Sequence, residues 1–268
     1  MRNNLEIEID HWTPAWYLDG SEFQLLSSIE CIDCLDFSGA RTILDIGCGD
    51  GKISNYLSEK NPGACIEGLD ISKEMIEFSK ERYSKSGVLE FFQGDIQSIK
   101  MSRQYDYIVS FWALSWLSNH EKAVENIWNS LKINGSLFLL IPTNNDLLFL
   151  TIESILSDDK WDSVIREKIN PTNTATCELY KKIFLKCNTT NIKVELRRIQ
   201  YDFNEKDKLK KYVKGWLPLL KNLDQAQQEN LLEDFVSIYN NFLFQTNQKL
   251  NTIYFDCIVV SGRKVNFQ

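Results

Sequence analysis

The chain has 268 residues, of which 43% are apolar, and it carries a formal net charge of −7 with an isoelectric point near 5.1. This acidity argues against a nucleic-acid-binding surface, because neutralising phosphates requires clustered Lys and Arg. The one basic cluster, residues 206–214, contains Asp207 and is interpreted as the solvated face of a helix.

No apolar run approaches the roughly 20 residues that a membrane-spanning helix needs, and the chain opens without a signal-peptide pattern. The seven cysteines are odd in number and lie mostly in apolar runs, which favours buried free thiols over disulfides. Cys31 and Cys34 could form a redox pair or half of a zinc site, but no second pair stands at metal-ligand spacing. We therefore predict a cytoplasmic protein without a bound metal.

The first predicted elements lie on either side of a glycine-rich loop. Apolar residues in 11–37 recur at helical spacing, so an amphipathic helix is expected there, placed to cover a site. Residues 42–46 form an apolar run that ends in three glycines at alternate positions, as a buried strand does when it breaks into a tight loop. The periodic stretch 52–59 predicts a helix, so the loop amides should lie near its positive N-terminus.

The spacing of this loop, and the acid before it, suggest its ligand. Dinucleotide-binding loops have G-x-G-x-x-G spacing, whereas this chain has G-x-G-x-G. Asp45 would repel a pyrophosphate but attract an ammonium or a sulfonium. The pattern favours a cationic cofactor such as S-adenosylmethionine; the alternative is a strand, loop and helix that bind no ligand.

Two further acids end predicted strands. Residues 64–70 predict a strand ending in Asp70, beside the first loop, where a carboxylate can accept both hydroxyls of a ribose. Ser72 should cap a helix running to about residue 85. Residues 90–95 predict a strand and turn, whose Asp95 could accept from an adenine amino group.

The remaining elements complete an α/β pattern. They are a strand at 105–111 entered through a structural Asp106, a helix at 121–131, a strand at 135–141, a helix at 146–166, a polar loop at 171–176, a helix at 178–187, a strand at 192–203, a helical stretch at 207–248 broken by Gly215 and Pro218, and a strand at 253–260. Alternating strands and helices imply right-handed crossovers and a parallel sheet with both faces covered.

We expect one domain, 1–268, because no composition break marks a linker. Its fold would be a doubly wound, mostly parallel, seven-stranded sheet. A cofactor-binding core at 41–142 and terminal strands at 191–203 and 252–262 would carry a lid, made of N-terminal helices at 1–40 and helical insertions at 143–190 and 204–250.

The order of elements and acids resembles the class I S-adenosylmethionine-dependent methyltransferases, which have a Rossmann-like fold. The resemblance covers 42–142, through the motifs LDIGCGDG, GLDIS, FQGDI, YDYIVSFWALSWLSNH and LKINGSLFLLIP. More narrowly, WTPAWYL at 12–18 resembles trans-aconitate methyltransferases. Tyr17 and Gln24, with SFWALSWL, YVKGWLP and the Leu-Glu-Asp-Phe stretch near Leu232, resemble juvenile hormone acid methyltransferases. Members of both groups esterify a free carboxylate.

The resemblance implies a role for each matching residue. The cofactor set is Asp45 for the ammonium, Gly47 and Gly49 against the methionine half, Tyr17 closing over that end, Asp70 on the ribose diol, Ile71 packing on adenine, Asp95 and the Ile96 amide at the adenine edge, with Cys48, Met75 and Ser110 also lining the site. Met75 could equally belong to the core of its helix.

The acceptor residues implied by the resemblance are Gln24 and Trp116, which would hydrogen-bond a substrate carboxylate. Ser115 stands where the hormone-acid enzymes often have His, so the substrate tail could be held differently. An aromatic side chain in this loop could also serve packing alone. His11 and His120 are isolated, and a surface or capping role is expected for both.

These residues predict an enzyme that methylates the carboxylate of a small or medium organic acid and releases S-adenosylhomocysteine. A carboxylate is ionised at neutral pH and needs no general base. The alternatives are O- or C-methylation of another small molecule, methylation of a carrier-bound malonyl group, or a cofactor-binding scaffold without turnover. Base N-methylation is disfavoured, because no Asn- or Asp-Pro-Pro-aromatic motif follows the fourth strand. The oligomeric state is left open.

Overall fold

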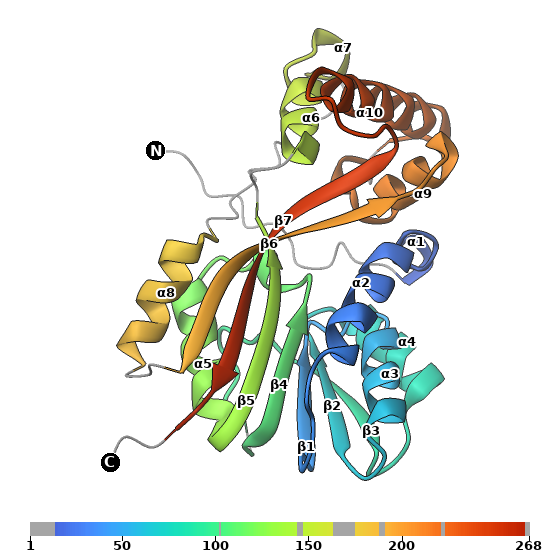
Figure 1. The fold of residues 1–268 in the computed structure, drawn as a ribbon. Helices are drawn as coiled ribbons and strands as arrows, with labels where there is room; N and C mark the ends of the chain where they lie inside the picture. The colour runs from blue at the N-terminus through green and yellow to red at the C-terminus, as the bar shows by residue number, and fades with distance from the viewer. Residues whose placement is uncertain are drawn as a thin grey trace, which may run out of the picture.

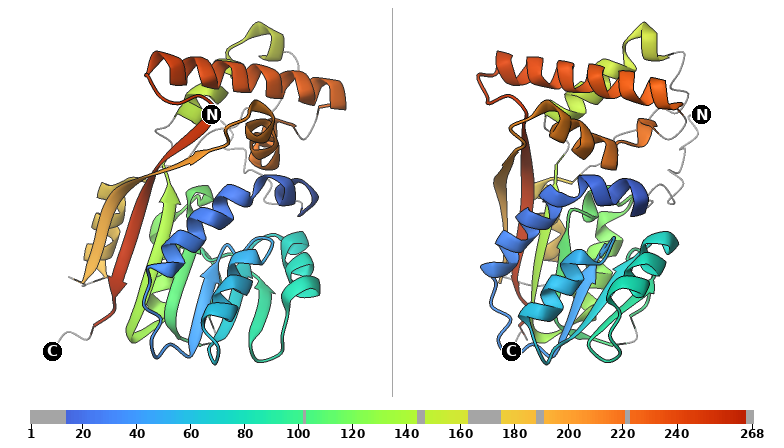
Figure 2. Two further views of the ribbon diagram at one scale, coloured as in Figure 1. Left: turned by 45° about the vertical axis from the view of Figure 1, so that its right-hand side comes forward. Right: turned by 90° about the vertical axis from the view of Figure 1, so that its right-hand side faces the viewer.

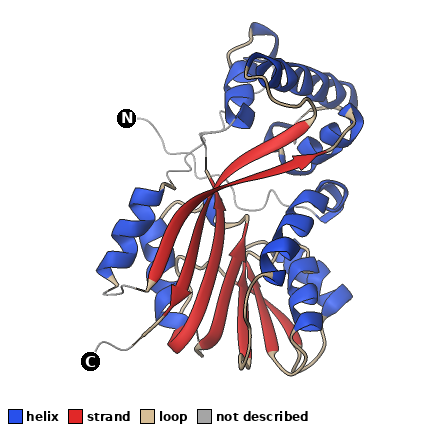
Figure 3. Ribbon diagram, in the orientation of Figure 1, coloured by secondary structure: helices blue, strands red, loops and turns tan. Residues whose placement is uncertain are grey.

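The computed structural model describes residues 14–101, 103–143, 147–162, 175–187, 191–220 and 223–265. Within these ranges seven strands form one sheet in the order β3, β2, β1, β4, β5, β7, β6 (Figures 1 and 3). They are β1 (Thr42–Ile46), β2 (Cys65–Asp70), β3 (Leu89–Gln93), β4 (Tyr105–Phe111), β5 (Leu131–Pro142), β6 (Ile192–Asp202) and β7 (Thr252–Arg263). β1 to β5 are parallel, whereas β7 is antiparallel to both β5 and β6. The predicted doubly wound, mostly parallel sheet is confirmed.

The strand order reverses at β1. Its neighbour on one side is β2 and on the other β4, so the crossovers leave this point in opposite directions. Ligands of open α/β sheets bind in the crevice outside the carboxyl ends of the strands at such a point. The loop after Ile46 and the residues after Phe111 therefore lie where a site is expected.

Helices cover both faces of the sheet (Figure 1). On one face lie α2 (Glu22–Asp33), α3 (Lys52–Lys60) and α4 (Lys73–Tyr83), and on the other lie α5 (His120–Ser130) and α8 (Cys177–Lys186). Strand side chains alternate between the two layers, because successive residues point to opposite faces. Ile43 and Ile66 pack in the first layer, while Leu44 and Leu69 pack in the second.

A further group of helices lies above the strand ends (Figures 1 and 2). We call it the cap; it consists of α6 (Leu147–Leu156), α7 (Asp159–Asp162), α9 (Lys206–Trp216), the short 3-10 helix η2 (Pro218–Leu220) and α10 (Gln225–Gln245). Pairing of β7 with β5 begins at Cys257, so residues 252–256 extend beyond the sheet with β6 as a two-stranded ribbon. Arg198 and Asp256 form a bidentate ion pair across this ribbon, at 2.8 and 2.9 Å.

The amphipathic helix expected within 11–37 is confirmed as α2 (Glu22–Asp33), but its extent as one piece is wrong. The chain forms α1 (Pro14–Gly20) and then α2, with Ser21 between them, while residues 11–13 lie outside the described ranges. A Cβ on Gly20 would come within 3.0 Å of the Gly215 Cα atom and 3.1 Å of the Lys211 carbonyl oxygen. Two glycines thus let α1 cross α9 closely, and this long-range contact accompanies the break between the helices.

The cap helices differ in part from the helices predicted at 146–166 and 207–248. The helix expected at 146–166 is confirmed over α6 and α7, but it is broken at residues 157–158. Residues 163–174, with most of the predicted polar loop, lie outside the described ranges. The break expected at Pro218 is confirmed, but the break expected at Gly215 is wrong, because α9 continues through Gly215 to Trp216. α10 then begins after Asp224, whose side chain accepts a 2.9 Å hydrogen bond from the Gln227 amide. None of the described helices combines the length and apolarity needed to cross a membrane.

Candidate functional site

The loop between β1 and α3 depends on its glycines, and for different reasons. Gly47, Gly49 and Gly51 have left-handed φ angles of 74°, 51° and 80°, which suit glycine. A Cβ on Gly47 would lie only 2.0 Å from the Ala113 Cβ, so this glycine permits the loop to pack against the residues after β4. At Gly49 the closest atom to such a Cβ, 4.0 Å away, is in the Tyr17 ring. Gly49 therefore leaves room beneath Tyr17.

Asp70, at the end of β2, holds this loop in place. Its carboxylate accepts hydrogen bonds from the Gly49 amide at 2.9 Å and from the Ser72 amide at 2.9 Å. Burial raises the pKa of Asp70, and the backbone hydrogen bonds oppose that effect. The acid thus stands beside the first loop, as its position in the fold predicts.

Asp45 is buried at the foot of the loop, with 2% of its surface exposed. Burial raises its pKa to about 7; the 2.6 Å hydrogen bond from the Ser54 hydroxyl opposes the increase, and the charge of Asp70 adds to it. A cation placed here would restore the ionised form. The electrostatics therefore suit an ammonium or sulfonium, as the sequence predicts.

Tyr17 of α1 lies close to three carboxylates. Its pKa is raised by burial and then by the charges of Asp50, Asp70 and Asp45. Asp50 was not among the predicted site residues; it is buried and pairs with Lys52 at 2.9 Å. The Lys52 ammonium also donates a 3.1 Å hydrogen bond to the Ser21 hydroxyl. Lys52 therefore links the start of α2 to the start of α3.

The predicted adenine end is built from the turns after β2 and β3. Gln93 donates from its side chain to the Ile71 carbonyl at 3.1 Å. The Asp95 carboxylate accepts the Gln97 amide at 2.8 Å, and the Asn126 side chain donates to the Ile96 carbonyl at 2.7 Å. These bonds fix the two turns at one edge of the sheet, while adenine contacts remain a prediction.

Three other predicted cofactor residues have internal partners. Ser110 is buried, and its hydroxyl donates to the Ile46 carbonyl at 2.8 Å, tying β4 to β1. Cys48 is buried, and its sulfur would lie 2.9 Å from a Cβ placed on Gly68. Met75 is buried on α4 with its amide capped by Ser72 at 3.3 Å. Each residue therefore supports the walls of the site, and direct cofactor contact remains a prediction.

The two predicted acceptor residues lie in different environments. Gln24 on α2 is 8% exposed, and its Oε1 is buried without a hydrogen-bond partner in the part of the chain that the structure describes. Trp116, in the 3-10 helix η1 (Leu114–Trp116), is 47% exposed. Only Gln24 thus presents a buried, unused polar atom.

Trp112 directly follows β4 and was not predicted as a site residue. Its φ of 66° is rare for a bulky side chain and costs of the order of 1–3 kcal/mol. Its indole Nε1 is buried with no partner among the described residues, which costs about 1–3 kcal/mol more. The only sequence signal is a second tryptophan within SFWALSWL.

His120 and Asp106 show how the surroundings of the site are held. The expected surface or capping role of His120 is wrong, because His120 is 4% exposed and the side chain of Asn119 caps α5. The His120 Nδ1 lies 3.0 Å from the Tyr180 hydroxyl of α8. The structural role of Asp106 is confirmed, because its carboxylate accepts the Arg41 and Thr42 amides at 3.0 and 2.9 Å and pairs with Lys132 at 2.9 Å.

The C-x-x-C cysteines and the main surface hollow lie away from the glycine loop. Every cysteine in the chain is a free thiol, and the C-x-x-C pair places Cys31 in the core and Cys34 on the surface. A surface hollow of about 510 Å³ is lined in part by Arg41, Lys60 and Ala64. These residues lie at the amino ends of β1 and β2, the edge of the sheet opposite the glycine loop.

Comparison with known proteins identifies the core. Residues 44–139 match a family model described as a methyltransferase domain. A protein named as a methyltransferase, 235L of Invertebrate iridescent virus 6, is 28% identical over 91% of this chain and 91% of its own. The juvenile hormone acid O-methyltransferase of Bombyx mori is 28% identical over 73% of each chain. The trans-aconitate 2-methyltransferase of Deinococcus radiodurans is 35% identical over 39% of each chain.

The fold has solved counterparts as well. The YcgJ protein of Bacillus subtilis superposes with a TM-score of 0.59 at 17% sequence identity, over 91% of this chain and 99% of that one. Similarity at this level of identity concerns the fold. The family match spans the strands and loops that build the candidate site, so residues 44–139 form a methyltransferase domain, and the chain is similar in sequence to juvenile hormone acid and trans-aconitate methyltransferases.

Proposed function

We propose that this methyltransferase acts on the free carboxylate of a small or medium organic acid. One observation supports this acceptor above others: the side-chain amide of Gln24 is buried and its Oε1 has no partner in the described chain. A half-turn of this amide exchanges its oxygen and nitrogen, so that the NH2 group can donate to a carboxylate at this position. Ser21 lies three residues before Gln24, on the same side of the helix. The Ser21 hydroxyl accepts a hydrogen bond from the ammonium of Lys52, which begins α3 directly after the glycine loop, so this side of α2 faces that loop. The names of the relatives from Bombyx mori and Deinococcus radiodurans, an acid O-methyltransferase and an aconitate methyltransferase, support the same class.

The residues around the loop fit the cofactor. The space at Gly49 beneath Tyr17, and the carboxylates of Asp45 and Asp70, suit a cationic ligand that lies against the backbone. We assign the ammonium to Asp45 and the ribose hydroxyls to Asp70. The adenine would lie between the turns that carry Ile71 and Asp95.

S-adenosylmethionine supplies a methyl group on a positively charged sulfur, which becomes a neutral thioether as the carbon–sulfur bond breaks and the new carbon–oxygen bond forms. The chain needs no general base, because the acceptor carboxylate is already ionised near neutral pH. Its residues must instead align one carboxylate oxygen and exclude water. Alignment of two reactants can contribute about 7–11 kcal/mol to the barrier reduction.

An amide is a suitable partner for this acceptor. Gln24 can donate to one carboxylate oxygen without forming a full ion pair, so the other oxygen stays nucleophilic. Trp116 stays a proposed donor from the resemblance, although its side chain is about half exposed.

The test is transfer of labelled methyl from S-adenosylmethionine to carboxylic acids of graded chain length. We expect label in an organic product that alkali releases as methanol, because an ester hydrolyses while an ether or a C-methyl product does not. Alkali-stable label on hydroxylated compounds would replace the carboxylate with another acceptor. Cofactor binding in calorimetry without transfer to any acceptor would instead point to a scaffold.

A further inference from the structure

We infer that two copies of this chain pair through β6, an edge strand of the sheet, and form a symmetric dimer with one continuous sheet. The two β6 strands would run antiparallel, with Leu196 of one copy opposite Leu196 of the other. β6 contributes none of the candidate site residues, so this pairing is independent of the identity of the methyl acceptor.

The backbone of β6 is unpaired along one side. The strand is last in the sheet order (Figure 1), and in the part of the chain that the structure describes it pairs with β7 alone. It has 11 residues, whereas β3 at the other edge has 5, the first of which is bridged by Lys85. A long free edge offers a template for another chain, and natural sheets usually shorten or cover it. We call the unpaired side of β6 the open edge.

The ladder with β7 determines which backbone groups face the open edge. At one end the Arg263 amide donates to the Asn191 carbonyl at 3.3 Å. At the other end the Phe203 amide donates to the Asn251 carbonyl at 3.1 Å. The register between these ends has no shift, and hydrogen-bonded pairs alternate with non-hydrogen-bonded pairs in an antiparallel ladder. Odd-numbered residues of β6 therefore bond to β7, while even-numbered ones, such as Leu196, direct their N–H and C=O groups to the open edge.

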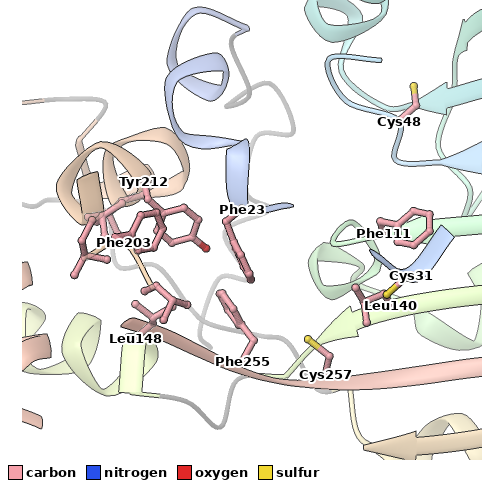
Figure 4. Close-up of a cluster of buried hydrophobic side chains, with 14 of the residues drawn as sticks. Phe23, Cys31, Cys48, Phe111, Leu140, Leu148, Phe203, Tyr212, Phe255 and Cys257 are labelled. Carbon is pink, nitrogen blue, oxygen red and sulfur yellow. The ribbon is translucent and has the colours of Figure 1, made fainter. Parts of the chain in front are cut away.

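The side chains of β6 alternate between the two faces of the sheet. Tyr201 packs on the core layer that contains the α2 side chains. Arg197 stands opposite Cys257, which lies among the buried side chains of that layer (Figure 4). Because side chains two residues apart share a face, Lys193 and Glu195 lie on this side with Arg197.

Opposite charges meet when the two-fold axis lies at Leu196. In that register Glu195 of each copy stands directly opposite Arg197 of the other. Arg197 is exposed and forms no ion pair with a described residue, while Glu195 pairs with Lys193 of its own strand. The dimer would therefore give each Arg197 a carboxylate, twice by symmetry, and opposite charges in directly opposed positions stabilise antiparallel strands.

Neighbouring registers are less favourable. An axis at Glu195 or at Arg197 places like charges opposite each other, which is destabilising. An axis at residue 198 or beyond leaves Arg197 opposite no carboxylate of the strand. An axis at Val194 keeps opposite charges together but pairs only residues 192–196, because β6 begins at 192. The proposed axis pairs residues 192–200.

Arg198 and Leu196 are compatible with this pairing. Charged side chains on an edge strand usually oppose association, but the Arg198 guanidinium is already held by Asp256 of β7. It would lie opposite Val194 of the other copy with its charge compensated. Leu196 is 59% exposed, and its contact with the same residue of the other copy would remove apolar surface from water.

The first experiment measures the mass of the parent protein by sedimentation equilibrium, over about a hundredfold range of concentration. We expect the average mass to rise from 31.2 kDa toward twice that value. The association should be weak and reversible, because a single pair of strand edges is a small interface. A parent protein that stays at 31.2 kDa throughout overturns the inference.

Two charge reversals test the register. Glu195→Lys and Arg197→Glu each make both symmetric contacts repulsive, so each variant alone should associate about tenfold more weakly than the parent, or less. An equal mixture of the two restores opposite charges at both contacts, and a heterodimer of parental affinity is expected. A mixture that stays monomeric overturns the register. Single variants that dimerise like the parent overturn the interface.

Leu196→Pro removes an N–H that the monomer does not use in its sheet. Proline is tolerated on an edge strand when the missing N–H faces outward, so the variant should bind S-adenosylhomocysteine like the parent and lose the dimer. Phe244→Lys is the matched control, because Phe244 is 75% exposed on α10, away from β6. It should keep parental association. Loss of the dimer in Phe244→Lys, or its retention in Leu196→Pro, overturns the inference.

Amide hydrogen exchange locates the contact in the parent protein and does not depend on how any variant folds. The amides of Val194, Leu196 and Arg198 should be better protected at high than at low protein concentration. Those of Glu195 and Arg197, which bond to β7, should be protected equally at both. Equal protection of the even-numbered amides at both concentrations, with the dimer present, would move the contact to another surface and overturn the inference.

Discussion

The Gly49 amide donates a 2.9 Å hydrogen bond to the carboxylate of Asp70. The acid that ends β2 thus holds the loop that follows β1, and its second oxygen accepts the Ser72 amide that opens α4. One side chain therefore sets the relative position of the two segments that would contact the methionine and ribose parts of the cofactor.

Replacing Asp70 with Ala should weaken cofactor binding by about 10- to 100-fold or more, since each hydrogen bond to a charged group is worth about 1.5–3 kcal/mol. Calorimetric titration with S-adenosylhomocysteine measures this change. Asp106→Asn is the matched control, because Asp106 accepts the Arg41 and Thr42 amides at the opposite edge of the sheet. That variant should lose stability and keep its affinity. Unchanged affinity in Asp70→Ala would remove Asp70 from the ribose site.

Asp45 should make cofactor binding depend on pH. Burial raises its pKa to about 7, and a bound ammonium favours the ionised form. Below pH 7 the ionised fraction falls about tenfold per pH unit, so affinity should fall with it. Near pH 6 binding should release a proton, seen as a dependence of the calorimetric heat on the buffer. Asp45→Asn should lower affinity and abolish this dependence; proton uptake or no linkage in the parent would contradict the assignment.

The raised pKa of Asp45 should also make the stability of the protein without cofactor depend on pH. A carboxyl whose folded pKa exceeds its unfolded value contributes stability below the unfolded pKa of about 3.9, and that contribution is lost as pH rises through about 7. The protein without cofactor should therefore lose stability over this range relative to Asp45→Asn. Urea unfolding at several pH values measures the difference, and a parallel pH profile in the two proteins would show that Asp45 is not the group responsible.

The sequence predicts the cofactor half of the site well, because the patterns that indicate it are local in the sequence. The glycines, Asp45 and Ser72 each lie within a few residues of a strand end, and the rule that carboxyl ends of parallel strands meet at one edge brings Asp70 beside the loop. Asp70 and Gly49 are 21 residues apart and in contact, as that rule requires. The positions of these residues follow from the fold class alone.

The acceptor half depends on contacts that no local pattern encodes. Trp112 acquires its left-handed φ and its neighbours Phe23 and Phe255 only when β4, α2 and the β7 ribbon assemble. The break between α1 and α2 accompanies the close approach of Gly20 to Gly215 in the cap. Helical periodicity in the N-terminal segment is the same whether the helix is one piece or two, so the sequence predicts one.

His120 should make the protein less stable in acid. Burial lowers its pKa below the ordinary value, so the neutral form that packs on Tyr180 is lost only by protonation. Stability is fully present above the unfolded pKa of about 6.5, and it should fall by up to about 1.4 kcal/mol per pH unit as pH drops toward the folded pKa.

Urea unfolding of the parent and of His120→Gln between pH 7.5 and pH 5 would measure this loss. The chain has two histidines, so the same measurement on His11→Gln shows separately what the other histidine contributes. An equal acid sensitivity in His120→Gln would assign the effect to other groups.

Gly47 should tolerate no side chain unless Ala113 gives way. Gly47→Ala places a Cβ 2.0 Å from the Ala113 Cβ at a φ of 74°. Gly39, with a φ of 78° and nothing within 4 Å of its added Cβ, is the matched control. Gly39→Ala should cost only about 1–2 kcal/mol for the left-handed conformation, whereas Gly47→Ala should cost roughly 1–3 kcal/mol more for overpacking.

A double variant separates the clash from the conformation. In Gly47→Ala with Ala113→Gly, the closest remaining Ala113 atom is its Cα at 3.5 Å, an ordinary contact. Most of the additional stability loss, and with it cofactor affinity, should therefore return, as thermal unfolding and calorimetry would show. If the double variant is no more stable than Gly47→Ala, the glycine is required there for its backbone conformation, and the packing of β1 against the residues after β4 is not what demands it.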